Sequence, residues 1–170
     1  MRSLVGGGEV EDCFWCCLSY LQFGNKDYAS ELALDYFTKK FQYTLEHSYG
    51  YQSGLHYPQD YAEQLATQRL EATNYAMTLS DMREWMGNVY TESYSMGMFG
   101  DRWIGILDPN FFPEFYENSN DNTLHAVVVE MVSSDGSLEV FDPQQPRLMF
   151  NSGRLVIEKE RAQNVKRLTY

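Results

Sequence analysis

The chain has 170 residues, 44% apolar and 22% charged, so it is long enough for one globular core and too apolar for a disordered protein. Its net charge of −11 argues against nucleic-acid and anionic-membrane partners, because phosphate binding requires basic patches. No apolar run approaches the roughly 20 residues that a membrane span requires, and residues 1–8 do not form a signal peptide. We therefore expect a single domain over residues 1–170, located in the cytoplasm.

The N-terminal part of the chain carries helical patterns. Asp12 is a good N-cap, the apolar residues after it recur at helical spacing, and Gly24 ends the pattern. A second helix is predicted over Tyr28–Phe41. The polar, tyrosine-rich segment Tyr43–Tyr57 is predicted to be a loop.

Two further helices are expected before the pattern changes. Pro58 can open a third helix that reaches about Leu70. A short fourth helix follows Thr78 or Ser80.

The C-terminal part of the chain carries apolar patterns that are typical of β-strands. A strong strand is predicted at Leu124–Val132, a turn at residues 133–136 and a return strand at Ser137–Phe141. Residues 110–122 form a long aromatic loop that could line a cleft or belong to the core. Other strands are predicted at Arg102–Leu107 and, from weaker patterns, at Leu148–Phe150, Arg154–Ile157 and Val165–Leu168. Helices followed by strands indicate an α+β fold.

All three cysteines fall within residues 13–17. Cys16 and Cys17 are adjacent, which is a poor geometry for a disulfide, so the thiols are expected to be free, as in a reducing compartment. Cys13 stands where a helix begins, and the partial positive charge of a helix N-terminus favours a thiolate. Taken alone, a cysteine at the start of an apolar helix is more often a buried structural residue than a reactive one.

His125 opens an otherwise apolar strand, so its ring needs a polar partner. If the turn after this strand closes a regular antiparallel pair, Asp142 lies opposite Val127 or Val129 and shares the face of His125. A one-residue bulge would turn Asp142 to the other face. The pattern predicts an Asp142–His125 pair that could serve the thiol of Cys13.

These residues lie in motifs that resemble the papain-like cysteine peptidases, above all their compact bacterial members: the peptidases that remove double-glycine leaders and the effector proteases of plant pathogens. The motifs are Asp-Cys-Phe at 12–14, His-Ala-Val-Val-Val at 125–129 and, 17 residues after the histidine, Asp-Pro at 142–143. The resemblance covers the two ends of the chain and none of residues 24–100.

The resemblance implies a papain-like α+β fold, in which the nucleophile begins the first long helix and an antiparallel sheet follows. It also implies that Cys13 is the nucleophile, His125 the general base and acid, and Asp142 the residue that orients the imidazole. The expected activity is hydrolysis of amide bonds in a peptide or protein substrate through a thioester, without a cofactor or metal.

One position departs from the family. Its members usually carry a glutamine about six residues before the cysteine, where it helps to form the oxyanion hole, and this chain has Gly7 there. The backbone N–H of Cys13 can supply one donor, but the nearby Glu9 and Glu11 cannot donate when ionised. The second oxyanion donor is therefore not assigned by the sequence.

Three other interpretations stay open. The same residues could serve a deamidase, amidase or acyltransferase, which differs from a peptidase only in its substrate pocket. Cys13 and Cys16 could form half of a metal site with a distant histidine, although structural zinc normally has four ligands. The chain could also be an inactive papain-like interaction module.

Overall fold

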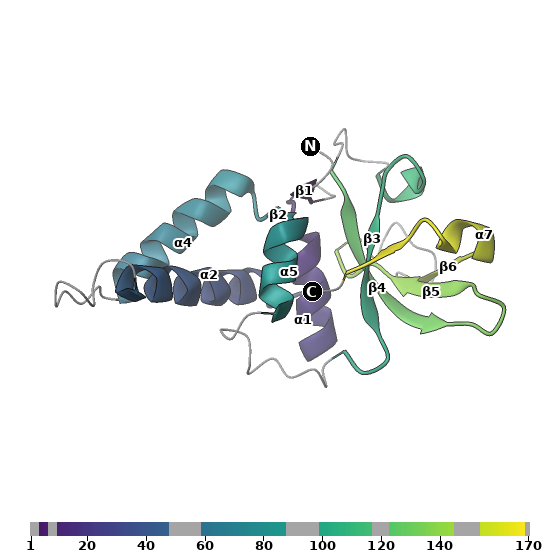
Figure 1. Cartoon of the computed structure of the whole chain (residues 1–170), viewed down its shortest axis with the longest axis horizontal. Helices are drawn as coiled ribbons and strands as arrows, with labels where there is room; N and C mark the ends of the chain where they lie inside the picture. Colours follow the sequence, from purple (N-terminus) through teal and green to yellow (C-terminus); the bar gives the residue numbers. More distant parts are fainter. Residues whose placement is uncertain are drawn as a thin grey trace.

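The structure is a computed structural model that describes residues 4–6, 10–47, 59–87, 99–116, 123–144 and 154–168. Figure 1 shows most of the helices gathered at one end and the main sheet, with one short helix beside it, at the other. The helices are α1 (Cys13–Phe23), α2 (Ala29–Leu45), α4 (Gln59–Thr73), α5 (Leu79–Gly87) and α7 (Lys159–Ala162), with a 3-10 turn η4 (Pro113–Tyr116). The strands are β1 (Leu4–Val5), β2 (Met77–Thr78), β3 (Trp103–Leu107), β4 (His125–Val132), β5 (Leu138–Phe141), β6 (Arg154–Ile157) and β7 (Lys166–Arg167).

The main sheet has the order β6-β5-β4-β3-β7, and every neighbouring pair in it is antiparallel. The predicted mixture of helices with an antiparallel sheet is therefore confirmed. A second, two-stranded sheet pairs β1 with β2, and Val5 also makes a parallel bridge to Leu124. These two short strands were not predicted, and the predicted strand Leu148–Phe150 lies outside the described residues.

Two buried clusters cover the two faces of the main sheet. Ala126 and Val128 of β4 face the helices and share a cluster with α1 and α2. Val127 and Val129 point to the other face, where Phe112 is fully buried. The aromatic segment after β3 thus contributes a core side chain, while its neighbour Phe111 is exposed.

Helix α1 is buried along most of its surface, which suits a helix with apolar residues on nearly every side. It begins and ends where the sequence predicts. Gly24 adopts the left-handed conformation, with φ of 83°, and its N–H donates to the Tyr20 carbonyl. This is a typical glycine helix end.

Helix α2 is longer than predicted. It continues to Leu45, so the expectation of a loop from Tyr43 onward is wrong for the first part of that segment. His47 closes the helix end: its ring stacks on Tyr43 with centroids 3.7 Å apart, and its Nδ1 lies 2.9 Å from the Tyr43 carbonyl oxygen. Such local contacts extend a helix without an apolar stripe. Residues 48–58, including His56 and Pro58, lie outside the described residues.

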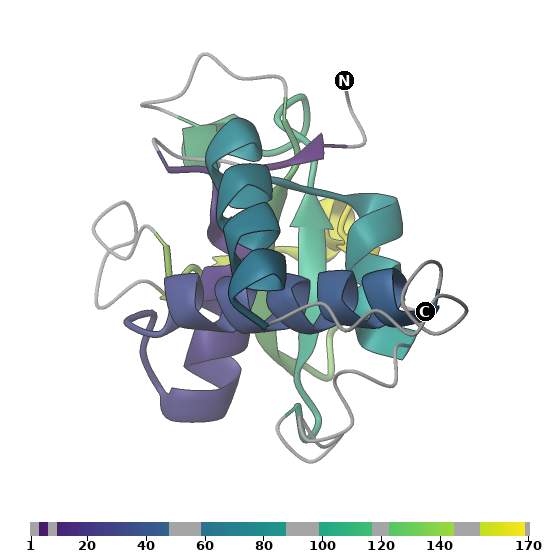
Figure 2. The same ribbon diagram turned by 90° about the vertical axis from the view of Figure 1, so that its left-hand side faces the viewer.

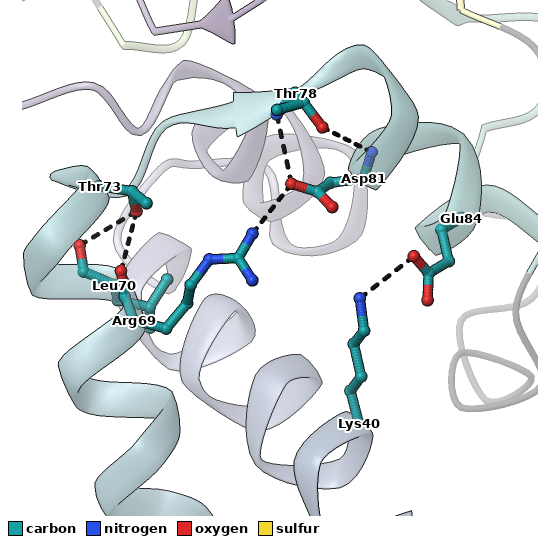
Figure 3. A network of polar contacts seen from close by, with 7 residues as sticks. All are labelled: Lys40, Arg69, Leu70, Thr73, Thr78, Asp81 and Glu84. Carbon is teal, nitrogen blue, oxygen red and sulfur yellow. Dashed lines mark hydrogen bonds and ion pairs between the residues drawn. The ribbon is translucent and has the colours of Figure 1, made fainter. Parts of the chain in front are cut away.

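Helices α2 and α4 pack on each other at the end of the molecule away from the main sheet, and Figure 2 shows α4 crossing α2 there. Helix α5 is tied to both of them by polar contacts (Figure 3). Arg69 of α4 forms an ion pair with Asp81 of α5 at 3.0 Å, and Lys40 of α2 forms one with Glu84 at 3.1 Å. These contacts hold α2, α4 and α5 together within the helical end.

Thr78 precedes α5 in the position of an N-cap. Its hydroxyl accepts the Asp81 N–H at 3.0 Å, and its own N–H donates to the Asp81 carboxylate at 3.5 Å, which makes a reciprocal capping box. The predicted N-cap of the fourth helix is therefore confirmed as Thr78.

We expect Thr78→Ala to lower the free energy of unfolding by about 1 kcal/mol, because the Asp81 N–H loses its acceptor. Thr78→Ser keeps a hydroxyl and should remain close to the wild type. Lys40→Ala removes an exposed ion pair and should cost less than about 1 kcal/mol. Urea denaturation of the three variants measures these differences, and equal losses in Thr78→Ala and Thr78→Ser would contradict the capping role.

Candidate active site

Cys13 is the first residue of α1, and this helix packs against β4 on the helical side of the sheet (Figure 1). The backbone N–H of Ala126 donates to Sγ of Cys13 at 3.4 Å. The sulfur therefore lies beside the residue that follows His125. It also accepts a backbone hydrogen bond at the N-terminus of a helix.

His125 and Asp142 are joined by a hydrogen bond of 2.7 Å between Nε2 and Oδ2. An ionised carboxylate only accepts hydrogen bonds, so Nε2 carries the proton and Nδ1 is the nitrogen left to exchange a proton with a thiol. The Cys13 side chain is close enough to the same ring to contribute to its raised pKa. The structure thus brings all three predicted residues together.

The strand pair that carries this contact contains a bulge. Val132 pairs with Leu138 and Met131 with Glu139, but beyond Glu130 the register shifts, so that Val129 pairs with Val140. In this shifted register Val128 pairs with Phe141, so the next residue, Asp142, lies opposite Val127.

The expectation that a bulge would separate Asp142 from His125 is therefore wrong. The turn begins with Ser133 opposite Ser137, where the N–H of Ser133 donates to the Ser137 carbonyl. Without a bulge, that register would set Asp142 opposite Val128, on the other face of the sheet. The extra residue, Glu130, restores the face that His125 uses.

The protonation of His125 is governed by its neighbours. Burial by itself lowers the pKa of this imidazole, whereas the charge and hydrogen bond of Asp142, together with smaller contributions from Cys13, raise the pKa to about 10. The net effect favours the imidazolium.

The other two cysteines differ from Cys13 in their surroundings. Burial raises the pKa of the Cys16 thiol, and the nearby Asp12 carboxylate raises it further. Burial likewise raises the pKa of the Cys17 thiol, with the charges of Cys13 and Asp142 adding to it. Both effects favour the protonated thiol at Cys16 and Cys17. All three cysteines are free thiols, as the sequence predicts.

Sequence reasoning missed Gln144, which follows the Asp-Pro motif. Its backbone N–H donates to Oδ1 of Asp142 at 3.1 Å, and its side-chain Nε2 donates to Oδ1 of Asp12 at 3.0 Å. The available signal was only its closeness to Asp142 in sequence. The Ala126 N–H was also missed, because a backbone donor has no sequence signature.

The site is closed to solvent. The exposed fraction of Cys13, His125 and Asp142 is 0% for each residue. A substrate therefore reaches Sγ only after some part of the chain moves away from it. Gly7, the position of the family's oxyanion glutamine, lies outside the described residues.

Comparison with known proteins found no relative of this chain. No protein-family model, no curated protein and no solved structure matches this chain. Among the described residues, no cluster of three or more His, Cys, Asp or Glu side chains is placed to hold a metal ion. None of the described helices is long and apolar enough to cross a membrane.

The raised pKa of His125 predicts a pH dependence of stability. Its folded-state pKa of about 10 exceeds the ordinary value of 6.5, so the folded chain holds one more proton than the unfolded chain between these two values. The resulting stability is complete below about pH 6.5 and is lost as the pH rises toward about 10. At most, the free energy of unfolding falls by about 1.4 kcal/mol per pH unit.

We expect the variant Cys13→Ala to keep a fall of this kind in urea denaturation above pH 6.5, over a narrower pH range because the smaller contributions of Cys13 to the raised pKa of His125 are lost while those of Asp142 remain. The double variant Cys13→Ala/Asp142→Asn should show a flatter dependence, because the neutral amide no longer favours the imidazolium. Apart from residue 142 itself, the two variants carry the same titrating groups. Parallel stability curves for the two variants would show that Asp142 does not set the charge of His125.

Proposed function

We propose that this protein is a papain-like cysteine hydrolase that cleaves amide bonds, acting as a cysteine peptidase on a peptide or protein substrate. One observation carries the proposal. The thiol at the N-terminus of α1 lies beside an imidazole that is itself hydrogen-bonded to a buried carboxylate. Covalent amide hydrolysis requires a nucleophile, a base beside it and a group that orients the base.

At the start of the reaction the thiol proton resides on Nδ1 of His125, so that a Cys13 thiolate faces an imidazolium. The thiolate attacks the carbonyl carbon of the amide and gives a tetrahedral oxyanion. The imidazolium then protonates the amide nitrogen, the C–N bond breaks, and the amine leaves. Cys13 now carries the acyl group as a thioester.

In the second half, His125 takes a proton from a water molecule while the water oxygen attacks the thioester carbonyl. The tetrahedral intermediate collapses, the C–S bond breaks, and the thiolate leaves beside the imidazolium, which restores the starting ion pair. Asp142 keeps the ring in one orientation and stabilises its positive charge throughout. The net reaction adds one water to the amide and gives an acid and an amine.

The oxyanion needs donors that are in place before the attack. The backbone N–H of Cys13, at the N-terminus of α1, would be one of them. Loss of a single such donor typically lowers the rate by about 10²–10³-fold. A chain with glycine at the usual glutamine position therefore needs another donor or turns over slowly.

The three free thiols of this chain fit a reducing compartment, so we place the proposed activity in the cytoplasm. The triad chemistry alone does not separate a peptidase from a deamidase or another amidase. The substrate decides between them.

A second candidate, an inactive interaction module with the same fold, is favoured by one observation. Cys13, His125 and Asp142 have no exposed surface, and a thiol that never meets a substrate is a core residue. The two candidates differ in whether Sγ becomes accessible in the folded protein in solution.

Alkylation with iodoacetamide separates the two candidates. For a hydrolase we expect the folded protein to be modified at Cys13 at pH 6.5, and His125→Ala to slow the modification by about 10–100-fold, because an ordinary thiol is about 1% ionised at that pH. Peptide mapping by mass spectrometry identifies the modified residue. Cys16→Ala is the matched control and should be modified at the wild-type rate. Modification of Cys13 only after denaturation would favour the inactive module.

Turnover of a panel of peptide, glutamine and muropeptide substrates then assigns the substrate class. Whichever class is hydrolysed, Cys13→Ala should lose about 10⁴-fold or more of kcat, as removal of a triad residue does, and Cys16→Ala should stay within a few-fold of the wild type. Equal activity of wild type and Cys13→Ala would contradict the proposed nucleophile.

A further inference from the structure

Gln144 links the loop that carries Asp142 to the segment that leads into α1. Its backbone N–H bonds to Oδ1 of Asp142, the carboxylate oxygen that His125 does not use. Its side-chain Nε2 donates to the Val10 carbonyl at 2.6 Å and to the Asp12 carboxylate at 3.0 Å. One residue therefore joins the two chain segments that hold the base and the nucleophile.

The loop is also held from the other end of α1. Lys26, in the turn after the helix, donates from Nζ to the Gln144 carbonyl at 3.1 Å. Backbone and side chain of Gln144 together thus contact residues before and after α1.

Gln144 also determines where the charge of Asp12 lies. An aspartate at the N-cap normally accepts an N–H of the first helical turn. Asp12 makes no such bond here, and its carboxylate instead meets the Gln144 amide and the Cys16 thiol. The N-terminal N–H groups of α1 are thereby not engaged by this carboxylate, which would compete with a thiolate or an oxyanion for them.

We propose that Gln144 is a positioning residue of this site, which holds the Asp142 loop and the start of the Cys13 helix in the register that brings thiol and imidazole together. The inference rests on the proposed function for its catalytic consequence. Its structural part, the alignment of His125 with Asp142, does not depend on activity.

A role in positioning and a role in general stability predict different results. The Gln144 side chain is only partly buried and belongs to neither apolar cluster, so its truncation opens no core cavity. Displacement of reacting groups by about 1 Å, by contrast, can lower a rate by about 100-fold. Rate and stability should therefore separate in Gln144 variants.

The experiment compares Gln144→Ala and Gln144→Glu in the full chain. Glutamate has the same shape, but its carboxylate cannot donate to Val10 and repels Asp12. On the substrate class found in the panel, both variants should lower kcat by about 10–100-fold with KM changed only a few-fold. In an NMR titration, the His125 midpoint should move down toward its ordinary value as the contact with Asp142 loosens.

Thr78→Ala is the matched control, because it destabilises the fold at a helix cap that touches none of these residues. It should change neither kcat nor the His125 midpoint. If the wild type is active, an unchanged kcat in both Gln144 variants, or an equal loss in Thr78→Ala, overturns the inference. If the wild type hydrolyses nothing, the proposed function fails by itself, and an unchanged His125 midpoint in the Gln144 variants overturns the positioning role.

Discussion

The hydrogen bond between His125 and Asp142 is the contact on which the candidate site depends. Both side chains have no exposed surface, and a charge placed in such a position is strongly unfavourable unless a partner and further hydrogen bonds compensate it. Each residue supplies that compensation for the other at 2.7 Å, and Gln144 occupies the second carboxylate oxygen. Removal of either partner alone would leave a buried polar group without compensation. The pair therefore adds a polar constraint on the register of β4 and β5 to that of the apolar clusters.

The bulge at Glu130 is the local feature that makes this register possible. It shifts the pairing by one residue between the turn and the middle of the strands, so that Asp142 reaches the face of His125. The same residue is bonded to α1, because the Tyr20 hydroxyl donates to its carboxylate, with Arg102 and Arg154 close to it. The shift that aligns Asp142 and the contact that holds α1 on the sheet therefore meet at one position. Bulges often re-aim side chains near functional sites in this way.

Structural features that depend on residues close together in the chain could be predicted from the sequence. Asp12 and Gly24 bracket α1, and the strand from His125 to Val132 follows from its apolar run. The three candidate site residues were also chosen correctly as neighbours in space. The bulge, the Ala126 N–H and the side-chain contacts of Gln144 could not be predicted, because they depend on backbone groups or on residues more than a hundred positions apart. The end of α2 was missed because ring stacking of Tyr43 and His47 replaces the apolar stripe there.

The closed state of the site limits how a substrate could enter. Separation of α1 from β4 would expose Sγ, but it would also break the Ala126 contact and move the thiol away from the imidazole, so the reacting groups would no longer be aligned. Helix α1 is held against such a movement near its start by Gln144 and further along by Glu130. The geometry is thus retained only if the opening comes from the chain that covers Sγ, while α1, β4 and the Asp142 loop stay together. In a hydrolase of this kind, the contacts that align the site and the movement that opens it must belong to different parts of the chain.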